Sequence, residues 1–288
     1  MKRTVSSRNG IGATAHIIQA RELLSAQIHI DEPTIIVVRA GKKCLRWAGN
    51  QLVLSPGDTI AVADNQSFDV INTPCCQTGI YEADWLVCND SIISAFLLNR
   101  PPTGKLIRDM LVVSSRNKPF LDSLDHARNG ITNQEGVPAN VAIARITEML
   151  VWLDHFGGHF NSPSSSRSVS SLVRQHVNSD VSTVWTSRMV AKELGMSEAT
   201  LRRRLADERA QFRSLLMDVR MTRALTLLQV TDMPITQISF DVGYDSPSRF
   251  TSRFKQRFGF RPSDVRMSKC SKIFQCGYLD SAKIIVSD

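Results

Sequence analysis

The stretch GYDSPSRFTSRFKQRFG, residues 243–259, carries a phenylalanine at every fourth position from residue 250 and cationic side chains in the gaps. Phe250 and Phe254 share one face of a helix, because successive residues are about 100° apart around the helix axis. Arg253 and Lys255 flank that face. The opposite face carries small and basic residues: Ser248, Arg249 and Ser252. The pattern predicts a helix whose apolar side packs on its own domain and whose basic side faces outward.

A second stretch, AKELGMSEATLRRRL at residues 191–205, repeats this design about 50 residues earlier. A helix is followed by glycine, one bulky residue and Ser197, which we expect to cap the next helix through its hydroxyl. Leu201 and Leu205 share the apolar face of that helix. Ala199, Arg202 and Arg203 lie opposite them, and Arg204 lies on a flank. Two helices joined by a short glycine turn form a helix-turn-helix, so the sequence predicts two such units.

The segment between the two units predicts a single long helix. Residues 211–229, QFRSLLMDVRMTRALTLLQ, would span about 28 Å at 1.5 Å per residue. That length is close to the roughly 34 Å of one turn of DNA. Because an α-helix fits the major groove and arginine can bind guanine through two hydrogen bonds, two outward faces at this separation could read successive major grooves. Further helices are expected at 168–178, 187–194, 198–208, 235–241, 247–257 and 262–268.

The charge of the chain is concentrated in its C-terminal part. Residues 1–166 hold 15 Lys and Arg against 15 Asp and Glu, whereas residues 167–288 hold 20 against 12. The whole net charge of +8 therefore belongs to the second part (20 − 12 = 8). A neutral part joined to a basic part indicates a sensing or assembling module tied to one that meets a polyanion.

The N-terminal part has a different pattern. Short β-branched runs at 34–40 and 51–63, with a Pro-Gly-Asp turn at 56–58, predict that residues from about 20 to 90 form a small sandwich or barrel. Segments 90–100, 103–113 and 120–130 look partly helical.

Residues 139–156 predict the clearest helix of this part. Its expected buried stripe consists of Ile143, Ile146, Met149, Leu150 and Leu153. Trp152 lies off that stripe, which leaves open either a dimer surface or a helix between two layers.

These patterns define an α+β chain with four parts. We predict an effector-sensing or dimerisation domain at 1–160, with a small-molecule effector and a second copy of the chain as candidate partners. The stretch GGHFNSPSSSRS, rich in glycine and serine, places a linker at 161–168. An all-α DNA-binding domain at 169–268 and a tail of unassigned role at 269–288 follow.

Several classes of protein are disfavoured. No apolar run approaches the roughly 20 residues of a membrane span, and no apolar stretch follows the basic N-terminus, so we expect a cytoplasmic protein without membrane association. The cysteines, at 44, 75, 76, 88, 270 and 276, lack metal or redox spacing and are expected to be reduced thiols. His16 and His29 do not match a metal site. No catalytic motif is present, so we expect neither an enzyme nor a cofactor.

By these residues the C-terminal part resembles the DNA-binding domain of the AraC/XylS family of bacterial transcription regulators. The resemblance covers residues 168–266. In the second unit it is carried by Gly243-Tyr244, Ser246, Phe250, Phe254-Lys255, Gly259, Pro262 and Arg266. In the first unit it is carried by Val190-Ala191, Leu194, Met196-Ser197, Leu201, Arg203, Phe212, Arg220-Met221, Ala224 and Leu228. The β-rich start is similar to the cupin-like barrel that many members place before this domain.

The resemblance implies that both units bind DNA. Base-reading roles would fall on Ala199, Arg202, Arg203, Ser248, Arg249 and Ser252. Arg253 and Lys255 would contact phosphates, which fix register without reading sequence. Arg204 completes the expected DNA-binding set. The implied function is a sequence-specific transcription regulator, with activation favoured over repression and with promoter DNA and RNA polymerase as partners. An adaptor that binds an acidic protein is the alternative from another class, and an enzyme is a third.

Overall fold

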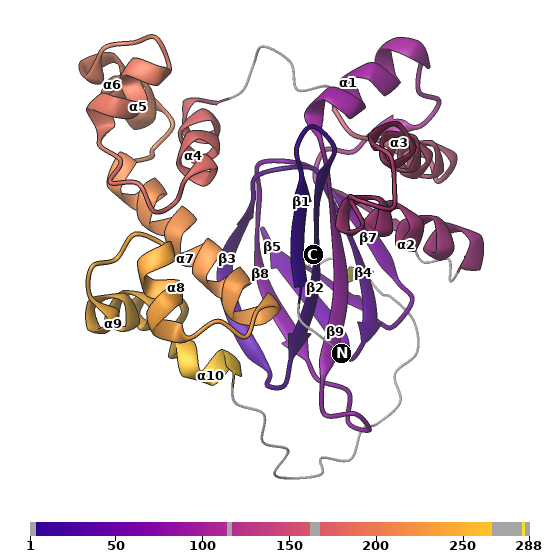
Figure 1. Ribbon diagram of the computed structural model, residues 1–288, viewed down its shortest axis with the longest axis horizontal. Helices are drawn as coiled ribbons and strands as arrows, with labels where there is room; N and C mark the ends of the chain where they lie inside the picture. The colour runs from indigo at the N-terminus through magenta and orange to yellow at the C-terminus, as the bar shows by residue number, and fades with distance from the viewer. Residues whose placement is uncertain (1–3, 114–116, 162–167, 267–283, 286–288) are drawn as a thin grey trace. The chain divides into compact units, whose positions relative to one another are not determined.

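The computed structural model describes residues 4–113, 117–161, 168–266 and 284–285, and the chain divides into two compact units. One unit comprises Met1–Pro163 with Met267–Asp288, and the other is Ser164–Arg266. Figure 1 shows strands and helices in the first unit and helices alone in the second. Most of the expected linker at 161–168 lies outside the described residues, as does most of the tail at 269–288.

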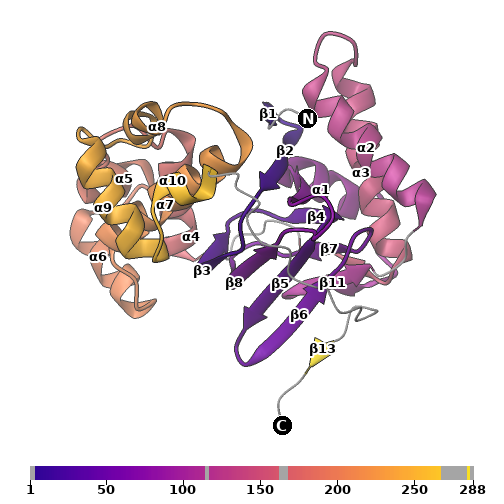
Figure 2. The same cartoon turned by 90° about the horizontal axis from the view of Figure 1, so that it is seen from below.

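Two antiparallel sheets form the centre of the first unit (Figures 1 and 2). Sheet A runs in the order β1 (Thr4–Arg8), β2 (Gly12–Gln19), β9 (Tyr81–Cys88), β4 (Thr34–Ala40), β7 (Thr59–Val62) and β11 (Met110–Val113). Sheet B runs in the order β13 (Ile284–Ile285), β6 (Asn50–Leu54), β5 (Lys42–Trp47), β8 (Gln66–Thr73) and β3 (Leu23–Ile30).

The two faces of sheet A have different neighbours, because successive side chains of a strand point to opposite sides. On β9, the rings of Tyr81 and Trp85 lie beneath the Lys43 ammonium of sheet B, so that face looks across to the other sheet. Leu86 and Cys88 point the other way, into an apolar core that the helices complete. The prediction of a β-rich N-terminal domain with added helices is confirmed.

Three helices cover the outer face of sheet A: α1 (Asp90–Asn99), α2 (Lys118–Thr132) and α3 (Ala139–His155). Phe120, Leu124 and Ile146 are fully buried against Ile35 and Val37 of the sheet. A parallel pair, β10 (Lys105–Leu106) with β12 (Gly158–His159), closes the end of this layer.

Asp154 of α3 fastens the chain beside β10. Its carboxylate accepts the backbone N–H groups of Thr103 at 2.8 Å and Gly104 at 2.7 Å. These hydrogen bonds hold the pKa of Asp154 below its usual value, and the one from Gly104 has the largest effect.

Three expectations for this unit are wrong. Segment 103–113 is not helical but contains β10 and β11, because its β-branched end pairs with β7 and its start pairs with β12. The strands also begin at Thr4, well before residue 20. On α3, Ile143 is 40% exposed while Ala142 is fully buried, so the buried stripe begins one residue earlier than predicted.

Trp152 of α3 packs against α2 within the domain. Its ring packs edge-on against Phe120 of α2, stacks on Phe156, and donates its Nε1–H to the Ser123 hydroxyl. These contacts within the chain explain why an apolar side chain lies off the buried stripe, without a second copy of the chain. The dimer stays a prediction.

In the described part of the second unit, residues 168–266, seven helices lie close to the predicted positions. They are α4 (Val169–Ser179), α5 (Ser187–Glu193), α6 (Glu198–Asp207), α7 (Phe212–Val230), α8 (Ile235–Asp241), α9 (Pro247–Phe258) and α10 (Pro262–Arg266). The long helix α7 packs against α4, which belongs to the first half of this domain, and against α8 and α10, which belong to the second half. The all-α prediction is confirmed.

Candidate nucleic-acid interface

The two helix-turn-helix units share one backbone turn. In the first, between α5 and α6, Gly195 adopts φ of 66° and the Met196 N–H bonds to the Ala191 carbonyl. In the second, between α8 and α9, Gly243 adopts φ of 79° and the Tyr244 N–H bonds to the Ser239 carbonyl. Left-handed backbone favours glycine, which explains why both turns carry it. The repeat seen in the sequence is therefore a repeat of structure.

Each turn starts a helix with a buried apolar side. The Ser197 hydroxyl accepts the Thr200 N–H at 3.1 Å at the start of α6, whose Leu201 and Leu205 are 1% and 2% exposed. On α9 the buried side is a column of rings: Phe250, Phe254 and Phe258. The rings hold α9 on its domain and leave the other side of the helix to solvent.

All nine predicted DNA-binding residues are exposed. They are Ala199, Arg202, Arg203 and Arg204 on α6, and Ser248, Arg249, Ser252, Arg253 and Lys255 on α9. Arg202 lies 3.7 Å from Glu198, and Arg253 donates to the Gln256 side chain at 2.9 Å. Within the described ranges, the side chains of Arg203 and Arg249 make no hydrogen bond or ion pair. Both guanidinium groups keep all their donors available for a partner.

Two residues in the middle of α7 were not among the predicted site residues. Asp218 accepts the Nε–H of Arg257, at 2.9 Å, and its other carboxylate oxygen lies 3.6 Å from Nη2 of Arg174. Arg220 donates to the Thr183 carbonyl at 2.9 Å and packs its guanidinium over the Tyr244 ring. Partners that lie 24 or more residues apart along the chain leave no local pattern in the sequence.

Glu208 joins the end of α6 to the start of α4. Its carboxylate accepts the backbone N–H groups of Val169 at 2.6 Å and Ser170 at 2.8 Å. Burial by itself would raise the pKa of Glu208, but the hydrogen bonds from Ser170 and Val169 hold that pKa below its usual value. An ionised carboxylate at a helix N-terminus is favourable, because the free N–H groups carry partial positive charge.

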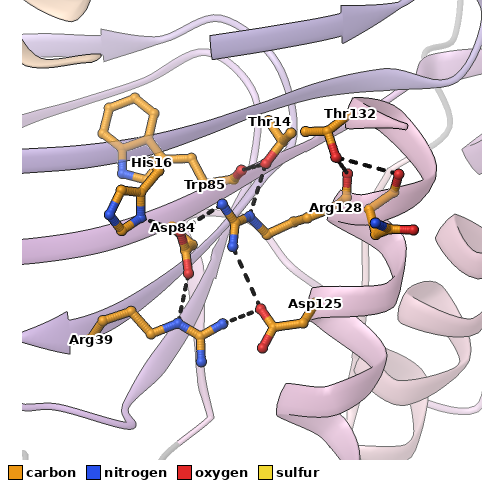
Figure 3. A network of polar contacts seen from close by, with 9 residues as sticks. Thr14, His16, Arg39, Asp84, Trp85, Asp125, Arg128 and Thr132 are labelled. Carbon is orange, nitrogen blue, oxygen red and sulfur yellow. Dashed lines mark hydrogen bonds and ion pairs between the residues drawn. The ribbon is translucent and has the colours of Figure 1, made fainter. Parts of the chain in front are cut away.

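The first unit holds a buried ion network between sheet A and α2 (Figure 3). The Asp84 carboxylate accepts from Arg39 Nε at 2.6 Å, lies 2.7 Å from Arg128 Nη2, and pairs with His16 Nδ1 at 2.7 Å. Burial would raise the pKa of Asp84, but these partners lower the pKa overall, and His16 has the largest effect among them. Asp125 of α2 also contacts both arginines, so the network ties the helix to the sheet.

A second polar cluster lies between the two sheets. Lys43 is only 2% exposed, and its ammonium donates to the Asn72 side chain at 2.9 Å. Burial lowers the pKa of Lys43 to about 7. The Tyr81 hydroxyl and the Trp85 Nε1–H, whose rings lie beneath the ammonium, have no hydrogen-bond partner within the described chain. The sequence does carry a signal for this site, because every second residue of a strand points to the same face and Lys43 therefore shares a face with the apolar Leu45 and Trp47.

Other expected features have a simple outcome in the described residues. Cys44, Cys75, Cys76 and Cys88 form no disulfide bond within the described ranges, and Cys270 and Cys276 lie outside them. No group of His, Cys, Asp and Glu there could hold a metal ion. None of the helices in the described ranges is long and apolar enough to cross a membrane.

Known proteins match this chain in its C-terminal part. Residues 190–268 match a family model described as a helix-turn-helix domain. The transcriptional activator AggR of Escherichia coli is 39% identical over 93 residues, which is 32% of this chain and 35% of AggR. The dual transcriptional regulator Rns of Escherichia coli is 36% identical over 149 residues, 52% of this chain and 49% of Rns. These alignments span less than half the length of either relative.

The solved structures match over most of the chain. Apo ToxT from Vibrio cholerae aligns with 89% of this chain and 97% of its own, at 14% identity and a TM-score of 0.65. ToxT bound to an unsaturated fatty acid aligns at 14% identity with a TM-score of 0.59, over 89% of this chain and 95% of its own. At this identity the likeness shows the fold.

The chain consists of a β-rich unit followed by a helical one, and residues 190–268 of the helical unit match a helix-turn-helix family model. Its helical domain carries two helix-turn-helix units joined by one long helix. The model that this domain matches is that of the AraC-family helix-turn-helix, and the likeness in sequence is centred on this domain.

Proposed function

We propose that this protein is a sequence-specific DNA-binding transcription regulator, and that it activates transcription from promoter DNA in the cytoplasm by working with RNA polymerase. The observation that supports this most directly is the pair of matched helices whose arginines, Arg203 and Arg249, are exposed and make no hydrogen bond or ion pair with the part of the chain that the structure describes. The names of two relatives, the activators AggR and CfaD of Escherichia coli, support activation.

In this proposal α6 and α9 enter successive major grooves on one face of the duplex. Arg203 and Arg249 read bases, with Arg202 beside the first and the small side chains Ala199, Ser248 and Ser252 allowing close approach. Arg204, Arg253 and Lys255 neutralise phosphates and hold the register.

Binding to DNA selected from a randomised pool tests these roles. Arg203→Ala or Arg249→Ala should cost about 1–3 kcal/mol on the selected site and relax preference at one base pair. Lys255→Ala should weaken binding to all sequences alike and reduce the salt dependence. Arg46→Ala, an exposed arginine of the first unit, removes the same charge and should change neither.

Two outcomes would contradict the proposal. Equal losses for Arg203→Ala on selected and random DNA would make that arginine a phosphate contact. An absence of binding even at low salt would favour the adaptor that binds an acidic protein.

For the first unit we propose a small-molecule effector that carries a carboxylate, held between the two sheets by Lys43. Within the described residues the buried ammonium donates one hydrogen bond, to Asn72, and the neighbouring Tyr81 hydroxyl and Trp85 Nε1–H have no hydrogen-bond partner. The fatty acid in the ToxT structure supports this ligand class.

An anion beside Lys43 would favour its charged form, so binding should take up a proton near pH 7 and weaken as the pH rises above that value. Calorimetry with an unsaturated fatty acid in buffers of different ionisation enthalpy measures that proton. Lys43→Met should abolish the binding, whereas Lys42→Met, on the opposite face of β5, should not. Binding that is equal in both variants would contradict the proposal.

A further inference from the structure

We propose that Asp218 and Arg220, two positions apart on α7, form a brace that fixes the position of α9 relative to α6 and so sets the spacing of the DNA half-sites that the protein accepts. The inference rests on the proposed function, because it concerns the DNA that both helices would read.

Asp218 connects helices from the two halves of the domain. One carboxylate oxygen binds Arg257, which lies near the end of α9. The other oxygen faces Arg174 of α4, the helix that precedes the first helix-turn-helix. The side chains of Arg257 and Arg174 are 13% and 11% exposed, so solvent competes little for either contact.

Arg220 makes a second connection between the same halves. Its guanidinium donates to the Thr183 carbonyl, in the loop between α4 and α5. The same group lies over the ring of Tyr244, which follows Gly243 in the turn of the second unit. An added Cβ on Gly243 would lie 2.5 Å from Arg220 Nη2, so the glycine is what allows the arginine to approach the turn.

The two connections act on opposite sides of α7. Residues two apart on a helix differ by about 200° around the axis, so Asp218 and Arg220 point in nearly opposite directions. A single contact would leave the second unit free to rock about it, whereas contacts on both sides restrain that rotation. Hydrogen bonds also weaken steeply when they are misaligned, so they define an angle more sharply than apolar packing does.

The apolar core already explains why the domain is folded. Leu215, Val219, Leu225 and Leu228 of α7 are nearly or fully buried. The brace therefore has a separate role, which is to select one arrangement of the two units among those that the core would tolerate.

The arrangement matters because each base pair added between half-sites moves the second one by about 3.4 Å and rotates it by about 34°. A braced protein should bind one spacing well and lose affinity when base pairs are inserted or deleted. A protein without the brace should follow the second half-site more readily.

The test uses the full chain and a duplex selected by the wild type from a randomised pool, with one or two base pairs inserted or deleted between its half-sites. We expect Asp218→Asn to reduce the loss of affinity on altered spacing by about tenfold relative to the wild type. Asp218→Glu should restore part of the discrimination. Asp241→Asn removes the same charge from the same domain but contacts only its own helix, through Gln237, and should behave as the wild type.

The outcomes separate this inference from the proposed function. If Asp218→Asn binds every spacing more weakly by the same factor, the residue is merely structural and the inference is overturned. If the wild type selects no sequence at all, the proposed function fails first. Should Asp218→Asn not fold, Arg257→Lys, which keeps the charge and loses the directional Nε–H bond, gives the same comparison.

Discussion

The guanidinium of Arg220 occupies the space that a side chain at Gly243 would need. An ideal Cβ there would lie 2.5 Å from Nη2 and 2.7 Å from the central guanidinium carbon. Gly243 therefore has two reasons to be glycine, its φ of 79° and its neighbour, whereas Gly195 at the equivalent turn has only the first.

The two glycines make a matched pair of variants. Gly195→Ala should cost about 1–2 kcal/mol, since only left-handed backbone strain is added. Gly243→Ala should cost about 1 kcal/mol more, because Arg220 must move and loses its hydrogen bond to Thr183. Urea unfolding of the full chain, followed by circular dichroism at a helical wavelength, measures both. Equal losses would show that Arg220 moves aside freely.

Burial of Lys43 should make the stability of the first unit depend on pH. Its pKa is about 7 in the folded chain and near 10.4 when unfolded, so the unfolded chain binds more protons between these values. Stability should therefore rise from pH 7 towards pH 10, by on the order of 4 kcal/mol. Burial raises the pKa of Tyr81, which acts in the opposite sense only above pH 10.

Lys43→Met should flatten this rise and stabilise the unit at pH 7. Lys42→Met should leave the dependence of stability on pH unchanged. Thermal unfolding at several pH values distinguishes them.

Removal of the Asp84 charge should destabilise the first unit strongly. Asp84→Asn leaves Arg39 and Arg128 with only the more exposed Asp125 as a shared carboxylate, at a cost of about 3 kcal/mol at neutral pH. Because the folded pKa of Asp84 is lowered, its contribution is complete above about pH 4 and is lost as the pH falls through that folded value. Asp122→Asn, on the exposed side of α2, is the control. A similar loss in both variants, measured by urea unfolding, would contradict the assignment.

Glu208 should stabilise α4 from outside that helix. Glu208→Gln removes the charge at the helix N-terminus and should cost about 1 kcal/mol at pH 7. The folded pKa of Glu208 is lowered, so the difference from the wild type should shrink below about pH 4. Chemical unfolding at both pH values is the measurement, and Glu193→Gln, exposed on α5, should show no such effect.

The second unit could be predicted well because its signals are local. The faces of α6 and α9 follow from angular position alone, and the two turns are marked by Gly195 and Gly243. Segment 103–113 could not be predicted in this way, because its strands exist only through pairing with β7 and β12, which are distant along the chain.

The same limit applies to the site residues. Exposure of Arg203 and Arg249 could be predicted from helical periodicity, since it needs no partner. The roles of Asp218, Arg220 and Glu208 depend on partners at least 24 positions away, and from sequence alone a single charged residue on a helix is interpreted as solvent-exposed.

The shared helix α7 has a consequence for how the domain folds. Because it packs against α4 in one half and against α8 and α10 in the other, neither half encloses a complete core without it. The two halves should therefore form one cooperative unit, which unfolds in a single transition and exchanges its core amide protons together. Each recognition helix then acquires its final position only in the folding step that also places the other.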